Sequence, residues 1–246
     1  ADEIDAYTKK IRKAILQLIT TRQAEFGSDA KAYLASHPDA GPQEGIDQVL
    51  ADSTLHLWHV RCPHCHGVSA VAREAEDWGV PVLDWNVPEL MKRVEDLERE
   101  AFLDHVAANV VLCCPHDGCH ATFGPEERLA VTNGGRWLQK HQRWLPDGTV
   151  EGERKVSKGM GFVIHGFMSP FFDLCETARD WASAALTAEL GDSTRLKEVV
   201  VKKLGETFRG TRAEEKADDW KVVQARLAAP YALKTVPAGV RFLTAF

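Results

Sequence analysis

The chain has 246 residues, of which 44% are hydrophobic and 27% are charged, and its formal net charge is −6. This composition excludes collagenous, low-complexity and intrinsically disordered proteins, and the length suits one or two globular domains. The acidic balance also excludes a general attraction to nucleic acid or to anionic membranes, so any site for a polyanion must be a local patch.

Neither a membrane span nor a secretory signal is visible. No window approaches the roughly 18 consecutive apolar residues of a transmembrane helix, and the N-terminus lacks a basic stretch followed by an apolar one. We therefore expect a soluble protein of the cytoplasm. Residue 1 is Ala, and residues 240–246 have the pattern of a strand with no turn or polar tail after it, so we expect a piece of a longer protein.

The first half of the chain contains two predicted helices. Apolar residues at three- and four-residue steps predict an amphipathic helix over 8–25. A short strand is expected at 31–34, followed by a loop at 36–42 that is rich in Pro and Gly. A second helix is predicted over 88–107, because it opens on Pro88 and keeps helical spacing of its apolar residues.

The second half contains a predicted helical hairpin. A turn is expected at 132–135, and a strand at 162–164. Asp173 marks the start of one helix, and a second helix over 194–204 ends at Gly205. Two consecutive helices joined by a short turn indicate a hairpin.

Six cysteines lie at positions 62, 65, 113, 114, 119 and 175, in a chain far larger than disulfide-stapled secreted domains. The sequence Cys-Pro-His-Cys-His at 62–66 recurs at 114–120 as Cys-Pro-His-Asp-Gly-Cys-His. Tetrahedral zinc takes two thiolates from each of two such knuckles. The expected zinc ligands are Cys62, Cys65, Cys114 and Cys119.

Alternatives to this zinc site remain open. Only Cys114 precedes Pro-His, so Cys113 is expected to be a spare, packed thiol. One alternative is that the cysteines bind no metal and are unpaired core residues. Another is that Cys62 and Cys65 form a redox pair. A third is that a nearby histidine, at position 59, 64, 66, 116 or 120, replaces one of the cysteine ligands. A site with four thiolates has no open coordination position, which predicts a structural role.

Two basic segments are candidates for contacts with DNA phosphates. Residues 128–158 carry seven basic residues against three acids, and residues 195–212 carry six against two. Such patches give a salt-dependent affinity for DNA, and an ordinary solvated surface is the alternative. The expected DNA-binding residues are Arg136, Lys140, Arg143, Lys155 and Lys158.

Four stretches resemble the large terminase subunit of lambda-like tailed phages, an ATP-driven motor and nuclease that packages DNA. They are residues 53–67, 111–119, 161–171 and 196–208, and the Gly-Phe to Ser-Pro segment at 161–171 is the most specific. The resemblance implies an α+β fold, in which a zinc-ribbon or knuckle region with helical hairpins is flanked by the end of a P-loop-type α/β domain.

The resemblance also implies a domain layout. Residues 1–50 are similar to the end of the ATPase domain, and residues 51–160 to a zinc-knuckle connector with a helical insertion at 88–107. Residues 161–230 are expected to form a strand and helical-hairpin linker. Residues 231–246 would begin the nuclease domain, whose catalytic acids are expected after the last residue.

Roles in ATP hydrolysis follow from the same resemblance. Asp2 and Glu3 look like the end of a Walker B strand, where the first acid holds magnesium and the second orients the attacking water. Ser36, with His37 and Pro38, resembles the motif that couples hydrolysis to movement. The alternative for two acids at a terminus is frayed surface charge. The sequence contains no G-x-x-x-x-G-K-[ST] loop, so ATP and Mg would bind only in a full-length subunit.

The function expected from the resemblance is part of a phage terminase large subunit that couples ATP hydrolysis to packaging and cleavage of double-stranded DNA. This chain would be mainly a zinc-stabilised connector, inactive alone. Implied partners are double-stranded DNA, a small terminase subunit, a portal ring and further copies of the chain, in the cytoplasm of an infected or lysogenic bacterial host. The alternatives are a stand-alone zinc-ribbon module that binds nucleic acid or protein, and a thiol oxidoreductase.

Overall fold

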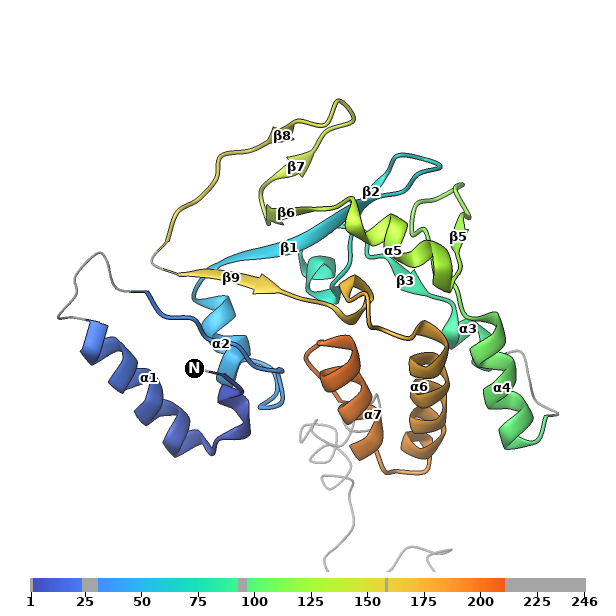
Figure 1. The fold of residues 1–246 in the computed structure, drawn as a ribbon, viewed down its shortest axis with the longest axis horizontal. Helices are drawn as coiled ribbons and strands as arrows, with labels where there is room; N and C mark the ends of the chain where they lie inside the picture. The colour runs from blue at the N-terminus through green and yellow to red at the C-terminus, as the bar shows by residue number, and fades with distance from the viewer. Residues whose placement is uncertain (1, 24–30, 93–96, 158, 211–246) are drawn as a thin grey trace, which may run out of the picture. The chain divides into compact units, whose positions relative to one another are not determined.

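The computed structural model describes residues 2–23, 31–92, 97–157 and 159–210. The fold is a mixed α+β type with helices around small sheets (Figure 1). Its helices are η1 (Ile4–Ala6), α1 (Lys9–Gln23), α2 (Gly45–Ala51), η3 (Arg73–Trp78), α3 (Val87–Lys92), α4 (Arg99–Asn109), α5 (Pro125–Asn133), η4 (Gly166–Met168), α6 (Leu174–Glu189), α7 (Thr194–Glu198) and the π-helical η5 (Val199–Leu204). Residues 1–209 form one compact unit.

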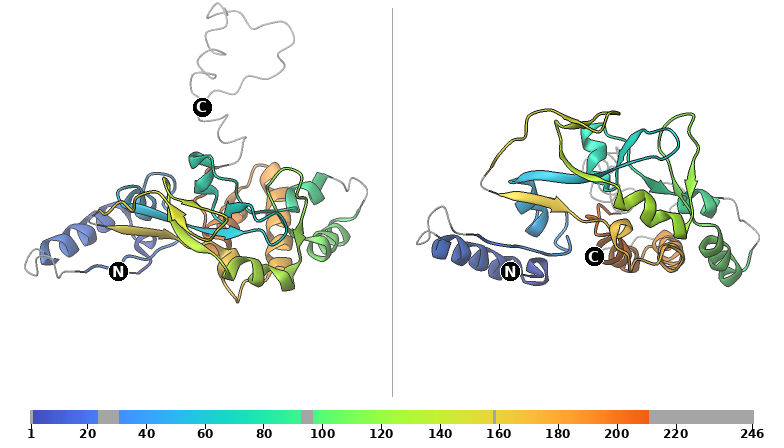
Figure 2. Two further views of the ribbon diagram at one scale, coloured as in Figure 1. Left: turned by 90° about the horizontal axis from the view of Figure 1, so that it is seen from above. Right: turned by 45° about the horizontal axis from the view of Figure 1, so that its top comes forward.

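The main sheet is built around β1 (Thr54–Arg61). Its C-terminal end pairs antiparallel with β2 (Val68–Ala70), and its N-terminal half pairs in parallel with β9 (Met160–Val163). The middle of β1 pairs antiparallel with β6 (Arg136–Gln139) on the opposite edge, since His59 pairs with both β2 and β6. Figures 1 and 2 show β9 beside β1, although the two strands are far apart in the sequence.

Two smaller sheets complete the strand structure. One has three antiparallel strands in the order β3 (Asp84–Trp85), β4 (Leu112–Cys113) and β5 (Thr122–Phe123). The other is a hairpin of β7 (Arg143–Trp144) and β8 (Val150–Glu151).

Apolar clusters cover both faces of β1. Val60 belongs to the larger core cluster, which includes residues of α4, α5 and α6, whereas Leu57 belongs to a smaller one that includes Ala75 of η3. Residues an odd number of positions apart point to opposite faces of a strand. Each face of β1 is therefore buried against a different cluster.

The helix α6 begins at Asp173 and packs between two other helices. The Asp173 side chain accepts a hydrogen bond from the Glu176 N–H at 2.9 Å, which satisfies one free amide of the first turn. The fully buried Ala178 and Ala182 let neighbouring helices approach closely. Figure 1 shows α6 between α4 and α7, and it contacts both helices.

Several sequence-based predictions are confirmed. The predicted helix over 8–25 corresponds to α1 within its described part, and the strand at 162–164 overlaps β9. The helix that starts after Asp173 is α6, and the helix over 194–204 is α7 continued by η5, with Gly205 in the left-handed conformation at its end (φ 77°). The helical hairpin is also confirmed.

Other predictions are wrong. Residues 31–34 were expected to form a strand, but they pair with no strand in the described part of the chain. The helix expected over 88–107 is two helices, α3 and α4, because Glu98 has an extended backbone (φ −58°, ψ 149°) directly before α4. The turn expected at 132–135 begins later, since α5 continues to Asn133. The strand expected at 240–246 lies outside the described residues.

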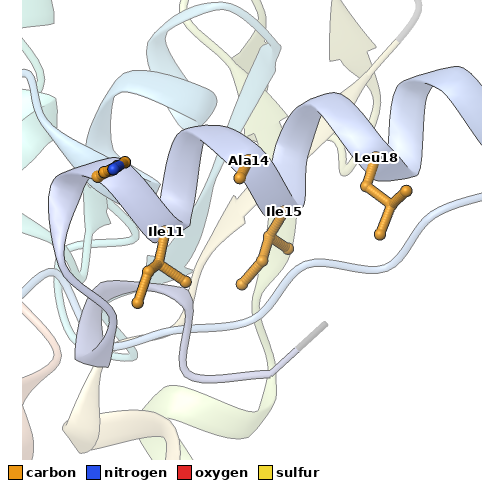
Figure 3. A pocket seen from close by; sticks show the side chains of 5 residues that line it. Ile11, Ala14, Ile15 and Leu18 are labelled. Carbon is orange, nitrogen blue, oxygen red and sulfur yellow. The ribbon is translucent and has the colours of Figure 1, made fainter.

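The helix α1 exposes an apolar stripe. Ile11, Ala14, Ile15 and Leu18 line, with Lys10, a shallow hollow of about 410 Å³ (Figure 3). Ile11 is 47% exposed and Leu18 is 53% exposed, so the described segments leave this stripe open. Within those segments, no helix is both long and apolar enough to cross a membrane.

Candidate metal centre

Two knuckles with the same backbone design carry the cysteines. The first connects β1 to β2 and is closed by the Cys62 N–H, which donates to the Gly67 carbonyl at 2.9 Å. The second connects β4 to β5 and is closed by the Cys114 N–H, which donates to the Ala121 carbonyl at 2.9 Å. The repeat in the sequence is therefore also a repeat in the structure.

The residue that follows the last cysteine of each knuckle has a left-handed backbone. His66 has φ 59° and His120 has φ 49°, in a region that few residues other than Gly adopt and in which Asn, Asp and His are the most frequent exceptions. Two independent turns share this feature at the same position. The shared geometry turns both pairs of thiols toward one point.

The four predicted ligands lie together. The sulfur atoms of Cys62, Cys65, Cys114 and Cys119 are all within 4.8 Å of one another. The Cys62 and Cys119 sulfurs are 3.7 Å apart, as are those of Cys65 and Cys114, so each close pair joins one knuckle to the other. Tetrahedral zinc with Zn–S bonds of about 2.3 Å separates its sulfur ligands by about 3.8 Å. The thiols thus fit a tetrahedral metal ion better than an isolated redox pair.

Backbone amides surround the sulfurs. The Gly67 N–H donates to the Cys65 sulfur at 3.4 Å. The Ala121 N–H donates to Cys119 and lowers the pKa of that thiol, whereas burial raises the pKa of the Cys114 thiol. Amide donors of this kind stabilise thiolates and orient them toward a metal.

Neighbouring side chains have packing roles. Cys113 stands apart from the cluster, half-buried, with its sulfur 4.0 Å from the Val111 carbonyl. The His116 Nε2 lies 3.2 Å from the Ser69 hydroxyl, and a Cβ atom added at Gly67 would lie 2.5 Å from the His116 ring. His116 therefore packs across the first knuckle. The sequence had indicated this histidine only as a possible ligand.

The acids near the N-terminus lie beside the segment that resembles the coupling motif. The Glu3 carboxylate is 2.8 Å from the His37 Nδ1, and Asp2 accepts a hydrogen bond from the Glu3 N–H at 3.0 Å. Ser36 accepts a hydrogen bond from the Asp5 N–H at 2.9 Å. The structure thus brings together two segments that are more than thirty residues apart, a separation of 34 for Glu3 and His37.

Asp5 is a buried acid that the sequence pattern did not single out. Its side chain is 1% exposed and accepts hydrogen bonds from the Ile46 N–H at 2.8 Å and the Ala40 N–H at 3.2 Å, with the Arg12 guanidinium 3.8 Å away. A Cβ atom added at Gly45 would lie 2.1 Å from the Asp5 carboxylate. One acid in an acidic stretch has no periodic signal, so only the fold reveals this anchor.

The expected DNA-binding residues lie on or beside the β7–β8 hairpin. Lys140, Arg143 and Lys155 are exposed. Lys158 lies outside the described residues. The three exposed cations belong to one stretch of the chain, which runs from the turn between β6 and β7 to the residues after β8.

The side chain of Arg136 has a structural role, because it binds the β7–β8 hairpin. Its guanidinium donates to the Gly148 carbonyl at 2.7 Å and lies 5.1 Å from the centre of the Trp144 ring. Arg61 lies 4.6 Å from the same ring and donates to the Pro146 carbonyl at 2.8 Å. Two guanidinium groups on one tryptophan hold the β7–β8 hairpin against the main sheet.

Arg128 cannot belong to a DNA-binding patch, which corrects the interpretation of residues 128–158. It is 3% exposed and donates to the carbonyls of Phe167 at 2.6 Å, Ser169 at 2.9 Å and Phe172 at 2.8 Å. A buried guanidinium needs such partners. Arg128 fixes the segment that leads into α6.

The second basic segment is also largely engaged within the chain. Lys203 pairs with Glu176 and Asp180 of α6. Arg209 lies 3.4 Å from Asp77, and Lys197 and Lys202 both pair with Asp39. Arg212 lies outside the described residues. Most of the basic residues in this segment therefore form ion pairs within the chain.

A buried His–Glu pair joins two of the stretches that resemble the terminase family. The His165 Nε2 lies 3.2 Å from the Glu206 carboxylate, and the His165 Nδ1 accepts a hydrogen bond from the Phe167 N–H at 3.1 Å. Burial by itself raises the pKa of Glu206, but the bond to His165 and the charge of Arg73 outweigh it and leave the pKa below its ordinary value. The pair therefore ties these two stretches together inside the fold.

Two family models match the chain. The model described as the phage terminase large subunit gpA, ATPase domain, matches residues 1–137, and that of the terminase large subunit gpA, endonuclease domain, matches residues 159–246. Comparison with curated proteins and with solved structures found no match. The first matched range covers more than half of the chain and includes both knuckles. The resemblance seen in the sequence is confirmed: the chain belongs to the phage terminase large subunit gpA family.

Proposed function

We propose that Cys62, Cys65, Cys114 and Cys119 hold one zinc ion. The sulfur separations of 3.7 Å, the amide donors and the repeated knuckles support this assignment. Four thiolates leave no open coordination position, so the ion has a structural role. It ties the β1–β2 turn to the β4–β5 turn and so joins the main sheet to the three-stranded sheet.

We propose that the chain takes part in the ATP-driven packaging and cleavage of double-stranded phage DNA. The observation that carries this proposal is the succession of an ATPase-domain match and an endonuclease-domain match on one chain. This succession favours a terminase over a stand-alone zinc-ribbon module or a thiol oxidoreductase. The proposed partners are double-stranded DNA, a small terminase subunit, a portal ring and further copies of the chain, in the cytoplasm of the bacterial host.

In this proposal Asp2 holds magnesium and Glu3 orients the water that attacks ATP. The contact between Glu3 and His37 supports a link between these acids and the coupling segment that begins at Ser36. The sequence has no phosphate-binding loop, so nucleotide binding requires one from elsewhere in a large subunit.

The domain layout is likewise a proposal. Residues 1–50 close an α/β ATPase domain, residues 51–160 form the connector, residues 161–230 the linker, and residues 231–246 begin the nuclease domain. Both matched ranges are longer than the ATPase and nuclease parts of this layout. The matched ATPase range continues through both knuckles, and the matched endonuclease range already begins at residue 159.

The function is tested with a large subunit that contains this sequence and a phosphate-binding loop. ATP hydrolysis and DNA cleavage are measured for the unchanged subunit and for Glu3→Gln, with the exposed Glu126→Gln as the matched control. Loss of a group that orients water lowers the rate by about a hundredfold or more, so we expect Glu3→Gln to lose hydrolysis and Glu126→Gln to keep it.

Two results would contradict these assignments separately. Hydrolysis at an unchanged rate by Glu3→Gln means that Glu3 does not orient the water. An unchanged subunit that neither hydrolyses ATP nor cleaves DNA means that the packaging function itself is wrong.

A further inference from the structure

Residues 36–47, named here the bridging loop, lie between the acids at the N-terminus and the helical hairpin. The loop starts at Ser36 and ends in the first turn of α2 at Asp47. It belongs to the range matched by the ATPase-domain model, whereas the hairpin of α6, α7 and η5 belongs to the range matched by the endonuclease-domain model. Contacts between the loop and the hairpin therefore connect the two matched ranges directly.

The first of these contacts is centred on Asp39. The Lys197 ammonium donates to the Asp39 backbone carbonyl at 2.9 Å and lies 3.1 Å from its carboxylate. The Lys202 ammonium lies 3.9 Å from the other carboxylate oxygen. The three side chains are each about 40% exposed, at 41% for Asp39 and Lys197 and 42% for Lys202, so these ion pairs add little to global stability. Two cations on one acid nevertheless define where the loop lies.

The second contact is at the end of the loop. The Thr207 hydroxyl donates to the Asp47 carboxylate at 3.1 Å, and the same carboxylate accepts a hydrogen bond from the Gln43 N–H at 2.6 Å. Thr207 follows η5 and directly follows the buried Glu206. The bridging loop is thus tied to the hairpin at Asp39, and to the segment that directly follows the hairpin at Asp47.

The opposite side of the loop is tied to the N-terminal acids. His37 contacts Glu3, and the buried Asp5 binds the amides of Ala40 and Ile46, one on each side of the loop. Pro38 is buried between these contacts. The bridging loop is therefore held to the N-terminal acids through His37, Ala40 and Ile46, on both sides of Asp39.

We propose that Asp39 with Lys197 and Lys202, together with Asp47 and Thr207, forms a positioning contact that transmits movement of the bridging loop to the helical hairpin. The inference rests on the proposed function, because a movement of the loop has a consequence only if the N-terminal acids act on ATP. The hairpin receives the movement as a unit, since Lys203 of η5 pairs with Glu176 and Asp180 of α6.

The test uses a packaging-competent large subunit that contains this sequence. ATP hydrolysed and base pairs moved are measured on the same preparation for Asp39→Asn and Lys197→Met. We expect hydrolysis within about twofold of the unchanged subunit and a fall of about fivefold or more in base pairs moved per ATP, the size of a typical coupling energy. A merely structural role would lower both quantities together.

Two further variants sharpen the comparison. Lys197→Arg keeps the charge and is expected to restore most of the coupling. Lys92→Met removes an exposed lysine that pairs with Glu89 far along the chain from the hairpin, and is expected to change nothing. Lys202→Met removes the longer of the two ion pairs and serves as the milder variant where Lys197→Met lowers the melting temperature.

The outcomes separate the inference from the function on which it rests. Unchanged base pairs per ATP in folded Asp39→Asn and Lys197→Met would show that the contact transmits nothing. A fall in hydrolysis and movement by the same factor also overturns the inference. If the unchanged subunit has no ATP-driven movement at all, the proposed function is wrong.

Discussion

Glu74 is a partly buried acid whose carboxylate is incompletely satisfied. Its Oε2 atom has no hydrogen-bond partner among the residues that the structure describes. Burial, and to a smaller extent the nearby charge of Glu206, raise the pKa of Glu74 above its ordinary value of 4.5. A raised pKa in the folded state means that ionised Glu74 destabilises the fold, and that this cost grows as the pH rises above the unfolded-state value.

Glu74→Gln should therefore stabilise the chain at neutral pH. We expect the free energy of unfolding to increase by about 1 kcal/mol at pH 7, and the gain to shrink as the pH falls toward 4.5, where Glu74 takes up its proton in both states. Urea denaturation at pH 7 and pH 5 measures the difference. The exposed neighbour Glu76→Gln is the control, and a gain that is equal at both pH values would contradict the explanation.

Individual residues also show what the sequence could not reveal. The cysteine cluster was predictable because a repeated motif specifies its own ligands, and the structure gathers those four sulfurs. The buried positions of Arg128 and Asp5 were not predictable, since each side chain binds backbone groups of distant segments. A buried charge that is satisfied by carbonyls or amides far away in the chain looks like any other charged residue in the sequence.

Among the elements, the β7–β8 hairpin carries the clearest candidate DNA surface. Lys140, Arg143 and Lys155 are exposed, whereas Arg136 is held by the Gly148 carbonyl and the Trp144 ring. The exposed cations are free to contact phosphates without disturbing the hairpin.

Neutralising these three residues to Gln should weaken duplex binding and its salt dependence together. Each lost phosphate contact lowers the slope of log affinity against log salt by about 0.9, so the triple variant should lower it by about 2 to 3. Fluorescence titration of a DNA duplex at several salt concentrations measures this slope.

The control for this titration neutralises three exposed lysines on other elements, Lys10, Lys13 and Lys92. An equal loss of slope in both triple variants would indicate a general effect of charge. An unchanged slope in the hairpin variant would exclude the hairpin as the DNA surface.

Element prediction succeeded where the signal was local. The helices α1, α6 and α7 have strong apolar periodicity, and Asp173 and Gly205 mark ends that the structure confirms. It failed at 88–107, where continuous spacing concealed the extended residue Glu98. The pairing of β1 with β9 had no local signal at all, because it depends on two segments meeting across most of the chain.

At the scale of the whole chain, one apolar core serves both matched ranges. The larger cluster contains residues from Val60 to Val131 and from Phe167 to Leu204. The proposed zinc site lies against this core, since Cys62 and Cys114 belong to it. Loss of the metal should therefore destabilise more than the two knuckles.

Zinc content is the direct measure of this dependence. Elemental mass spectrometry of the chain, purified without chelator, should find one zinc per chain, retained in Cys113→Ser and lost in Cys114→Ser together with the cooperative melting transition. Retention of zinc by Cys114→Ser, or a zinc-free parent chain, would remove the assigned ligand set.

The parallel pairing of β1 with β9 also sets an order of events during synthesis. The His56 ring and the Gly161 carbonyl that meet across these strands are 105 residues apart. At the usual pace of bacterial ribosomes, roughly 5 to 20 s pass between the emergence of one strand and the other. For that interval the nascent chain presents an uncovered strand edge along Thr54 to Leu57. Neighbouring nascent chains on one polysome are then the nearest competitors for the place that β9 later takes.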